Sequence, residues 1–325
     1  MAAQFAPETS KRGEFVRQAN RFTDRITADS ASAPGGGPDE HGRWPLEPGR
    51  YRLIWSRACP WAHRARIVLG LLGLLGLGEA ISLGTVDPLR DERGWRFTLD
   101  PDGRDPVLGI ELLSEAYLRA DPSFGGRVTV PALVDTLSGR VVSNDYPQLT
   151  LDFSTEWAPL HAANAPDLLP ADIRPELDAL MEEIYQDVNN GVYRCGFASS
   201  QEAYDEAYDR LFARLDALEE RLTGHRFLFG DRITEADVRL FTTLVRFDAV
   251  YHNHFRCNRN KLTEMPALWG YARDLYQTPG FGDTVDFDQI KRHYYGTHQM
   301  LNPSGIIPLG PDLSGWQQPH GRAPR

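Results

Sequence analysis

The chain has 325 residues, of which 41% are hydrophobic and 25% charged, so it can bury an ordinary core and is expected to form a soluble globular protein of two domains. Its formal net charge of -10 disfavours nucleic acid and anionic lipid as partners. The longest apolar run, residues 67–77, is shorter than the roughly 20 residues that span a bilayer, and the start of the chain has no apolar signal segment. We therefore expect no nucleic-acid partner, no membrane partner and a cytoplasmic location.

The first half of the chain is predicted to combine strands and a helix. Residues 1–45 are polar and rich in Gly and Pro, which predicts an extended arm. Residues 51–55 alternate like a strand, and residues 61–74 follow as a helix after a short turn. Further strands are predicted at residues 81–86, 128–134 and 140–143. Residues 87–127 are expected to be irregular. Pro131 cannot donate to a ladder, so it is expected at the entry or edge of its strand, where a cis peptide bond is possible.

The second half is predicted to be helical, because apolar residues recur there at three- and four-residue spacings. The predicted helices cover residues 173–188, 202–222, 235–250 and 267–277. Thr234 and Asp237 form a predicted capping box at the start of the third helix. From Asn302 onward, glycine and proline predict a return to irregular structure.

Cys59 stands where the first predicted strand turns into the first predicted helix. Pro60 is favoured at the first helical position, so the sulfur is expected beside backbone N–H groups and the positive end of the helix dipole. Thiols in such places, with basic residues nearby such as Arg57 and Arg64, have pKa values lowered from about 8.5 to roughly 3.5–7.5. A buried, inert cysteine is the common alternative, but this context favours a nucleophile.

The helix start carries one cysteine where dithiol oxidoreductases carry two. The fourth position of the tetrad that begins at Cys59 is Ala62, so no disulfide can close within that turn. An adduct on Cys59 must then be released by a small-molecule thiol, unless the fold brings Cys195 or Cys257 close to it. Three dispersed cysteines also argue against a disulfide framework and against a cysteine zinc site.

The six residues Cys59-Pro60-Trp61-Ala62-His63-Arg64 resemble the active-site motif of the Xi-class glutathione transferases, the glutathionyl-hydroquinone reductases. Segments that resemble the same family follow, in its order, at residues 126–131, 189–193, 229–237, 246–251 and 293–295. The resemblance implies the glutathione transferase architecture and a homodimer. An α/β thioredoxin-like N-terminal domain at residues 46–165 would precede an all-α C-terminal domain at residues 166–310 that covers the thiol site, with an irregular tail at residues 311–325.

The resemblance also implies a reaction. In the family, the cysteine thiolate attacks the sulfur of a glutathionyl-hydroquinone, the hydroquinone leaves, and a second glutathione resolves the mixed disulfide. Cys59 takes the place of that nucleophile. We therefore expect a thiol-dependent reductase that uses glutathione or a related thiol as a cosubstrate, holds no bound cofactor, and has thiols and quinone or hydroquinone conjugates as its partners.

The site residues that the resemblance implies fall into two sets. The thiol-binding set consists of Trp95, Arg127, Val130 and Pro131. The catalytic set consists of Cys59 with Tyr193, Tyr251 and Tyr294, whose hydroxyls can bond hydroquinone oxygens and help to protonate the departing ring. The choice between Tyr294 and Tyr295 is open. The alternatives are a packed loop side chain for Trp95, a solvated one for Arg127, and core packing for the tyrosines.

Asp145 and Tyr146 stand where most members of the family carry a Glu-Ser pair that holds the γ-glutamyl end of glutathione. Asp145 can still pair with an ammonium group, but the bulky Tyr146 cannot replace a small serine hydroxyl. Only three of the 35 basic residues are lysines, a bias associated with high-GC bacteria, some of which use mycothiol. Mycothiol is therefore an alternative cosubstrate.

Other functions stay open at this point. A conjugating transferase shares the fold but activates its thiol with a Ser or Tyr hydroxyl, which the presence of Cys59 disfavours. A dehydroascorbate reductase or general thiol transferase would use the same thiolate, and a non-catalytic binding module would keep the fold without turnover. No metal site is predicted, because His252 and His254 point to different faces of a helix and no matching ligand pair is apparent elsewhere.

Overall fold

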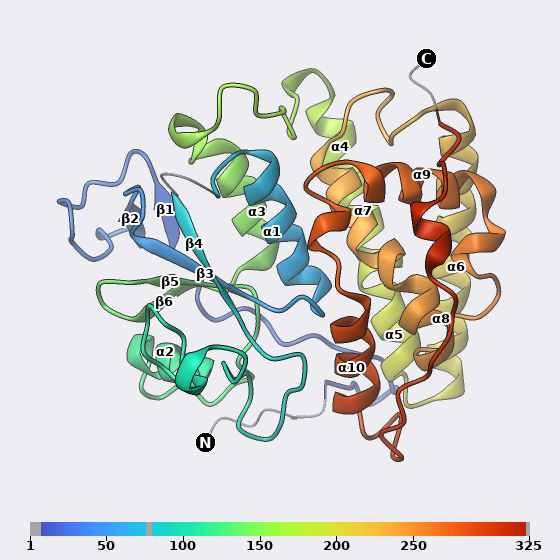
Figure 1. Cartoon of the computed structure of the whole chain (residues 1–325), viewed down its shortest axis with the longest axis horizontal. Coiled ribbons are helices and arrows are strands. Elements are labelled where there is room, and N and C mark those ends of the chain that lie inside the picture. Colours follow the sequence, from blue (N-terminus) through green and yellow to red (C-terminus); the bar gives the residue numbers. More distant parts are fainter. Residues whose placement is uncertain (1–7, 76–79, 323–325) are drawn as a thin grey trace. The chain divides into compact units, whose positions relative to one another are not determined.

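The computed structural model describes residues 8–75 and 80–322, and its internal contacts divide the chain into two units (Figure 1). One unit contains Gln18–Pro166, and the other combines the described residues of Pro7–Arg17 with those of Asp167–Arg325. Residues 1–7 of the predicted arm, residues 323–325 of the predicted tail and the end of the apolar run at 67–77 lie outside the described residues.

A sheet of four strands forms the centre of the first unit. Its strands are β3 (Tyr51–Trp55), β4 (Ile81–Thr85), β5 (Ala132–Asp135) and β6 (Arg140–Ser143), in the order β4-β3-β5-β6. Strands β3 and β4 are parallel, whereas β5 is antiparallel to both β3 and β6. The α-helices of this unit are α1 (Pro60–Leu71), α2 (Leu113–Ala120) and α3 (Tyr146–Thr155). A β-α-β unit followed by a hairpin and a helix is the thioredoxin-like arrangement, which confirms the predicted α/β class of the N-terminal domain.

Two differences from the predicted elements have local causes. Strand β5 begins at Ala132 rather than at residue 128, because Pro131, which follows a cis peptide bond, has no N–H to give to a ladder. Helix α2 forms within the span predicted to be irregular. Its residues Leu113, Ala116 and Tyr117 share one face and are buried, so tertiary packing stabilises a helix too short for a clear sequence period.

The segment predicted as an extended arm also departs from that prediction. It contains two short strands, β1 (Arg25–Thr27) and β2 (Arg43–Pro45), which pair in parallel. Thr23 forms a bridge with Ser143 at the end of β6, and Trp44 is buried. The later part of the arm is therefore folded into the first unit. Strands of three residues are too short to show an alternation that a sequence could reveal.

The second unit is helical, as predicted. Its α-helices are α4 (Arg174–Ile184), α5 (Gly191–Phe197), α6 (Gln201–Gly224), α7 (Glu235–Arg246), α8 (His252–His254), α9 (Pro266–Gln277) and α10 (Phe287–Thr297). Two π-helical segments, η4 (Tyr185–Asn189) and η5 (Phe247–Tyr251), follow α4 and α7. The helices predicted at 173–188 and 235–250 are thus each an α-helix with a π-helical end, a feature that often marks functional sites. The predicted capping box of Thr234 and Asp237 is present at the start of α7.

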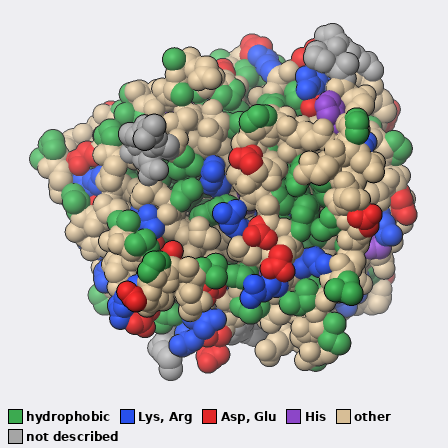
Figure 2. Space-filling model, in the orientation of Figure 1, with side chains coloured by type: hydrophobic (Ala, Val, Ile, Leu, Met, Phe, Trp, Pro, Cys, Tyr) green, Lys and Arg blue, Asp and Glu red, His purple; other side chains and the backbone are tan. Residues whose placement is uncertain are grey.

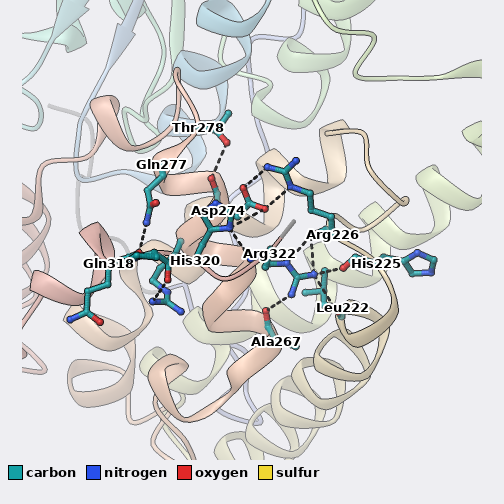
Figure 3. A network of polar contacts seen from close by, with 12 residues as sticks. Leu222, His225, Arg226, Ala267, Asp274, Gln277, Thr278, Gln318, His320 and Arg322 are labelled. Atoms are coloured by element: carbon teal, nitrogen blue, oxygen red, sulfur yellow. Dashed lines mark hydrogen bonds and ion pairs between the residues drawn. The ribbon is translucent and has the colours of Figure 1, made fainter. Parts of the chain in front are cut away.

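The described part of the C-terminal segment packs within the second unit, against residues of α6 and α9 (Figure 3). The Trp316 ring lies 4.7 Å from the ring of Trp269. The Arg322 guanidinium donates hydrogen bonds to the carbonyl oxygens of Leu222 at 2.9 Å, of Arg226 at 3.0 Å and of His225 (Figure 3). Because α6 ends at Gly224, Arg322 provides donors for carbonyl groups at the end of this helix that lack intrahelical partners.

Replacing Arg322 by alanine is expected to lower the free energy of unfolding by about 1–3 kcal/mol, because the part-buried carbonyls of Leu222 and Arg226 lose hydrogen bonds from a charged donor. Urea unfolding followed by circular dichroism measures the change. Arg292→Ala is the matched control, since the pair that Arg292 makes with Asp288 at 3.6 Å lies on the surface and such pairs contribute little. Equal losses in the two variants would contradict the capping role of Arg322.

The face of the molecule drawn in Figure 2 carries charges of both signs. On the face drawn in Figure 2, Lys and Arg side chains lie among Asp and Glu side chains, with apolar side chains scattered between them. Within the described ranges, no helix is both long and apolar enough to cross a membrane.

Candidate active site

The predicted site residues divide between the two units. Cys59, Trp95, Arg127, Val130, Pro131, Asp145 and Tyr146 belong to the first unit, and Tyr193, Tyr251, Tyr294 and Tyr295 belong to the second.

Cys59 is the N-cap residue of α1 and follows the end of β3 by a short turn. Its backbone is extended, Pro60 takes the first helical position, and the Cys59 carbonyl accepts a hydrogen bond from the N–H of His63 at 2.9 Å. The thiol is half-buried. A cysteine in this position lies next to the N–H groups of the first helical turn and the positive end of the helix dipole, an environment that favours the thiolate.

Two of the predicted thiol-binding residues share one apolar cluster with Cys59. In its protonated form the Cys59 thiol donates a hydrogen bond to the carbonyl oxygen of Val130 at 3.4 Å, and the Val130–Pro131 peptide bond is cis. Val130 and Trp95 are members of a buried apolar cluster against which Cys59 packs. Trp95 is only 4% exposed, so most of its ring packs in the core of the first unit.

Asp145 and Tyr146 lie at the start of α3. Asp145 is its N-cap residue, and its Oδ1 accepts a hydrogen bond from Asn20 Nδ2 at 3.0 Å. Burial raises the pKa of Asp145, and the bond from Asn20 opposes that rise. The Tyr146 ring packs against Trp61 in the first turn of α1, with 4.7 Å between the ring centres. A tyrosine ring packed in this way cannot replace the small serine hydroxyl that would hold the γ-glutamyl end of glutathione.

The segment predicted as an arm makes hydrogen bonds to residues of the first unit that no sequence pattern indicated. The N–H of Arg127 donates a hydrogen bond to Gln18 Oε1 at 2.8 Å, and Gln18 Nε2 donates one to the Arg127 carbonyl oxygen at 3.2 Å. The N–H of Phe22 donates to Asn144 Oδ1 at 3.0 Å, while the N–H of Asn144 donates to the Phe22 carbonyl at 2.9 Å. Single amide side chains in a polar segment carry no periodic signal, so only the folded chain reveals that they hold the segments of Arg127 and Asp145.

Three tyrosine hydroxyls meet in the second unit. The Tyr294 oxygen lies 2.7 Å from that of Tyr193 and 2.8 Å from that of Tyr251. These residues come from α10, α5 and η5, and all three are buried. The hydroxyl of Tyr295 instead accepts a hydrogen bond from Asn253 Nδ2 at 3.2 Å. The structure therefore groups Tyr294, and not Tyr295, with the other two predicted tyrosines.

The electrostatics of the tyrosine cluster favour neutral phenols. Burial raises the pKa of Tyr251 and of Tyr294 well above its ordinary value, and the neighbouring Tyr193 raises both further. Arg246, a fully buried residue at the end of α7, opposes this rise for both. At neutral pH the two hydroxyls therefore keep their protons and can donate hydrogen bonds to an oxygen that arrives beside them.

Aromatic and histidine side chains surround the tyrosine cluster. Phe255 stacks on Tyr251 at 5.4 Å and meets Tyr193 edge-on at 5.3 Å. His254 Nε2 lies 3.3 Å from His298 Nδ1. Burial, with a smaller effect of Arg256, lowers the pKa of His254 to about 4, so the ring is neutral at neutral pH.

In residues 8–75 and 80–322, no group of three or more side chains is placed to hold a metal ion.

Because the pKa of His254 is lowered, the folded state becomes less stable as the pH falls. An unfolded histidine takes up a proton near pH 6.5, whereas folded His254 does so only near pH 4, so the unfolded state gains protons first as the pH falls. We expect the free energy of unfolding to drop by up to about 3 kcal/mol between these pH values. Urea unfolding at several pH values tests this. His254→Phe should flatten the dependence and the exposed His41→Phe should not, and identical curves for both variants would contradict it.

Cys195 and Cys257 lie together in the second unit. Both are fully buried, and Cys195 is close enough to Cys257 to affect its thiol. Burial raises the pKa of the Cys257 thiol well above its ordinary value. Thiols in such surroundings are poor nucleophiles, so this pair has the properties of packed core residues.

Comparison with known proteins gives four informative matches. Residues 201–274 match the family described as Glutathione S-transferase, C-terminal domain. Glutathionyl-hydroquinone reductase YqjG of Escherichia coli is 44% identical over 315 residues, covering 95% of this chain and 92% of that protein, and its glutathione-bound structure matches with a TM-score of 0.84. A glutathione transferase from Gordonia bronchialis is 57% identical, with a TM-score of 0.87 over 92% of this chain and 89% of the other. The Xi glutathione transferase of Phanerochaete chrysosporium is 37% identical, with a TM-score of 0.85 over 94% and 95%.

Proposed function

Because the chain belongs to the Xi-class glutathione transferases, the family of the glutathionyl-hydroquinone reductases, we propose that it reduces glutathionyl-hydroquinones to hydroquinones with Cys59 as the nucleophile. The observation that carries the proposal is the single cysteine at the N-cap of α1, with Ala62 where a resolving cysteine would stand. A lone activated thiolate can accept a thiol adduct but cannot release it by itself.

The reaction has two steps, a reductive cleavage of a thioether and a thiol–disulfide exchange. The Cys59 thiolate attacks the sulfur of the conjugate, the bond between sulfur and ring carbon breaks, and the ring takes the electron pair and a proton to become the hydroquinone. A second glutathione thiolate then attacks the glutathione sulfur of the mixed disulfide and releases Cys59 as a thiolate. One conjugate and one glutathione thus give one hydroquinone and one glutathione disulfide, so the substrate is reduced and glutathione is oxidised.

The tyrosine cluster is proposed to bind the hydroquinone. Tyr193, Tyr251 and Tyr294 form a chain of hydroxyls, of which those of Tyr251 and Tyr294 keep their protons at neutral pH. Such donors can bond the ring oxygens and stabilise the negative charge that develops when the carbon–sulfur bond breaks.

Glutathione is the proposed cosubstrate, supported by the glutathione-bound structure of a relative 44% identical to this chain. In this proposal Trp95, Arg127 and the Val130 backbone hold its middle and glycyl parts, Pro131 fixes the turn, and Asp145 receives its ammonium group. Mycothiol is the second candidate, favoured by the packing of Tyr146 on Trp61 where the family pattern has a serine. Mycothiol has no γ-glutamyl group, so it does not need that serine.

Asn20→Ala is expected to raise KM for glutathione severalfold and to leave kcat nearly unchanged. The variant loses the hydrogen bond that orients Asp145 and opposes the rise of its pKa. Asp145 would then be protonated at higher pH, so the loss of glutathione affinity in acid should begin at higher pH than in the parent protein. Steady-state kinetics across the acidic range measure both effects. Asn258→Ala, at an exposed position, is the control, and a KM equal to that of the parent protein would contradict this role of Asp145.

Hydroquinone release from thiol conjugates of menadiol tests the proposed function. Glutathionyl and mycothiolyl conjugates are each assayed with the matching free thiol. Turnover with one pair supports the reductase and identifies the cosubstrate. No turnover with either pair, together with reduction of dehydroascorbate or of simple mixed disulfides, would replace it with a general thiol transferase. No turnover with any of these substrates would favour the third alternative, a non-catalytic binding module.

A homodimer in the cytoplasm is the proposed state of the protein, by analogy with the family. Light scattering coupled to gel filtration is expected to give twice the 36.6 kDa mass of the chain, and a mass of one chain would contradict the dimer.

A further inference from the structure

The N-terminal segment that precedes the first unit contacts the tyrosine cluster. Phe15 is buried and stacks on Tyr193, with 6.1 Å between ring centres and 26° between planes. The guanidinium carbon of Arg17 lies 4.8 Å from the centre of the Tyr193 ring. Arg17 also donates from Nε at 3.2 Å and from Nη2 at 3.1 Å to Oδ1 of Asn190, which comes directly before α5.

The same segment is anchored to the second unit by its backbone. The N–H of Ser199 donates to the Gly13 carbonyl at 2.9 Å, and Ser200 Oγ donates to the Arg12 carbonyl at 2.7 Å. Gly13 has a φ of +87°, and a Cβ there would lie 2.7 Å from Ser200 Oγ, so glycine is required at this contact. The backbone contacts of Arg12 and Gly13 and the hydrogen bonds to Asn190 together fix the position of Arg17.

We infer that Arg17 is a positioning residue for the reaction proposed above: it holds the Tyr193 ring in place, and its charge stabilises negative charge on the phenols and on the hydroquinone oxygens they bind. The inference rests on the proposed function. A guanidinium over an aromatic face is attracted to the ring, and a nearby cation favours the ionised form of a phenol. Because the Tyr193 and Tyr294 oxygens are 2.7 Å apart, stabilisation at Tyr193 extends along the hydroxyl chain.

Other titratable groups also face this cluster. Arg246 acts on Tyr251 and Tyr294 from the end of α7. His254, on α8, has its pKa lowered to about 4 and is neutral at neutral pH. His293 and His298 pack edge-on against Tyr294 at 5.3 and 5.5 Å. Among these groups Arg17 is the one that faces the Tyr193 ring with a permanent charge, so its removal can be separated from the titration of the histidines.

The test compares Arg17→Lys with Arg17→Met in the full chain, using a glutathionyl-menadiol conjugate and glutathione at neutral pH. Arg17→Met is expected to lower kcat by about three- to tenfold with a smaller change in KM, and Arg17→Lys to restore most of the rate. The alkaline limb of the kcat profile should lie at higher pH in Arg17→Met, because the phenols lose a cation that favours their ionised form. Arg12→Met, on an exposed surface pair, is the matched control.

Equal kcat values and equal pH profiles for the Lys and Met variants would overturn the inference, since packing alone would then explain the contact. If Arg17→Met loses its fold in circular dichroism, Arg17→Gln takes its place, because it keeps a donor for Asn190 without the charge. The rate of Cys59 alkylation should be the same in all variants. Absence of turnover in the parent protein would reject the proposed function instead, so the two failures are distinguishable.

Discussion

Cys59→Ser is expected to lower hydroquinone release by at least about a thousandfold, because removing a catalytic nucleophile costs that much or more. A serine hydroxyl stays protonated at neutral pH and cannot form a mixed disulfide. Single-turnover assays with the menadiol conjugate measure the loss, and circular dichroism checks that the variant is folded.

Cys195→Ala is the matched control for this experiment. Cys195 is fully buried beside Cys257, so we expect the variant to retain turnover if it folds. Full activity of Cys59→Ser, or a complete loss in the folded Cys195 variant alone, would show that the nucleophile has been misassigned. Alkylation of Cys59 by iodoacetamide should also follow an apparent pKa below the value of about 8.5 for an ordinary thiol, because of its place at the start of α1.

Tyr294→Phe is expected to lower kcat by about a hundredfold, within the range of a lost proton donor. Its hydroxyl is the central member of the chain and contacts both Tyr193 and Tyr251, so its removal also breaks two buried hydrogen bonds. Steady-state kinetics with the menadiol conjugate measure the effect, and thermal unfolding shows how much of it comes from lost stability.

Tyr295→Phe separates the two neighbouring tyrosines. Its hydroxyl contacts Asn253, which is exposed, so we expect its loss to change kcat little. A larger loss of kcat in Tyr295→Phe than in Tyr294→Phe would mean that the hydroxyl chain does not bind the hydroquinone.

Local signals account for the features that the sequence predicted well. Cys59 and Pro60 mark a helix start by a rule that needs no distant contact, and the same is true of the Thr234–Asp237 capping box. The division into an α/β half and a helical half follows from hydrophobic period alone.

Distant contacts account for what the sequence did not predict. Asn20 meets Asp145, and Arg17 meets Asn190, across more than a hundred residues of chain. Neither contact leaves a pattern in the polar N-terminal segment. Its composition alone therefore predicted an extended arm. Tyr294 and Tyr295 are adjacent in sequence, and only the packing of α10 determines which hydroxyl joins the chain of three.

The most direct measurement is mass spectrometry of the protein after one turnover with glutathionyl-menadiol and no free glutathione. We predict one glutathione per chain, located on Cys59 by peptide mapping, together with one released hydroquinone. Added glutathione should then remove the adduct, and Cys59→Ser should neither gain it nor release hydroquinone. Release of hydroquinone without an adduct on Cys59, or with an adduct on Cys195 or Cys257, would contradict the mixed-disulfide mechanism.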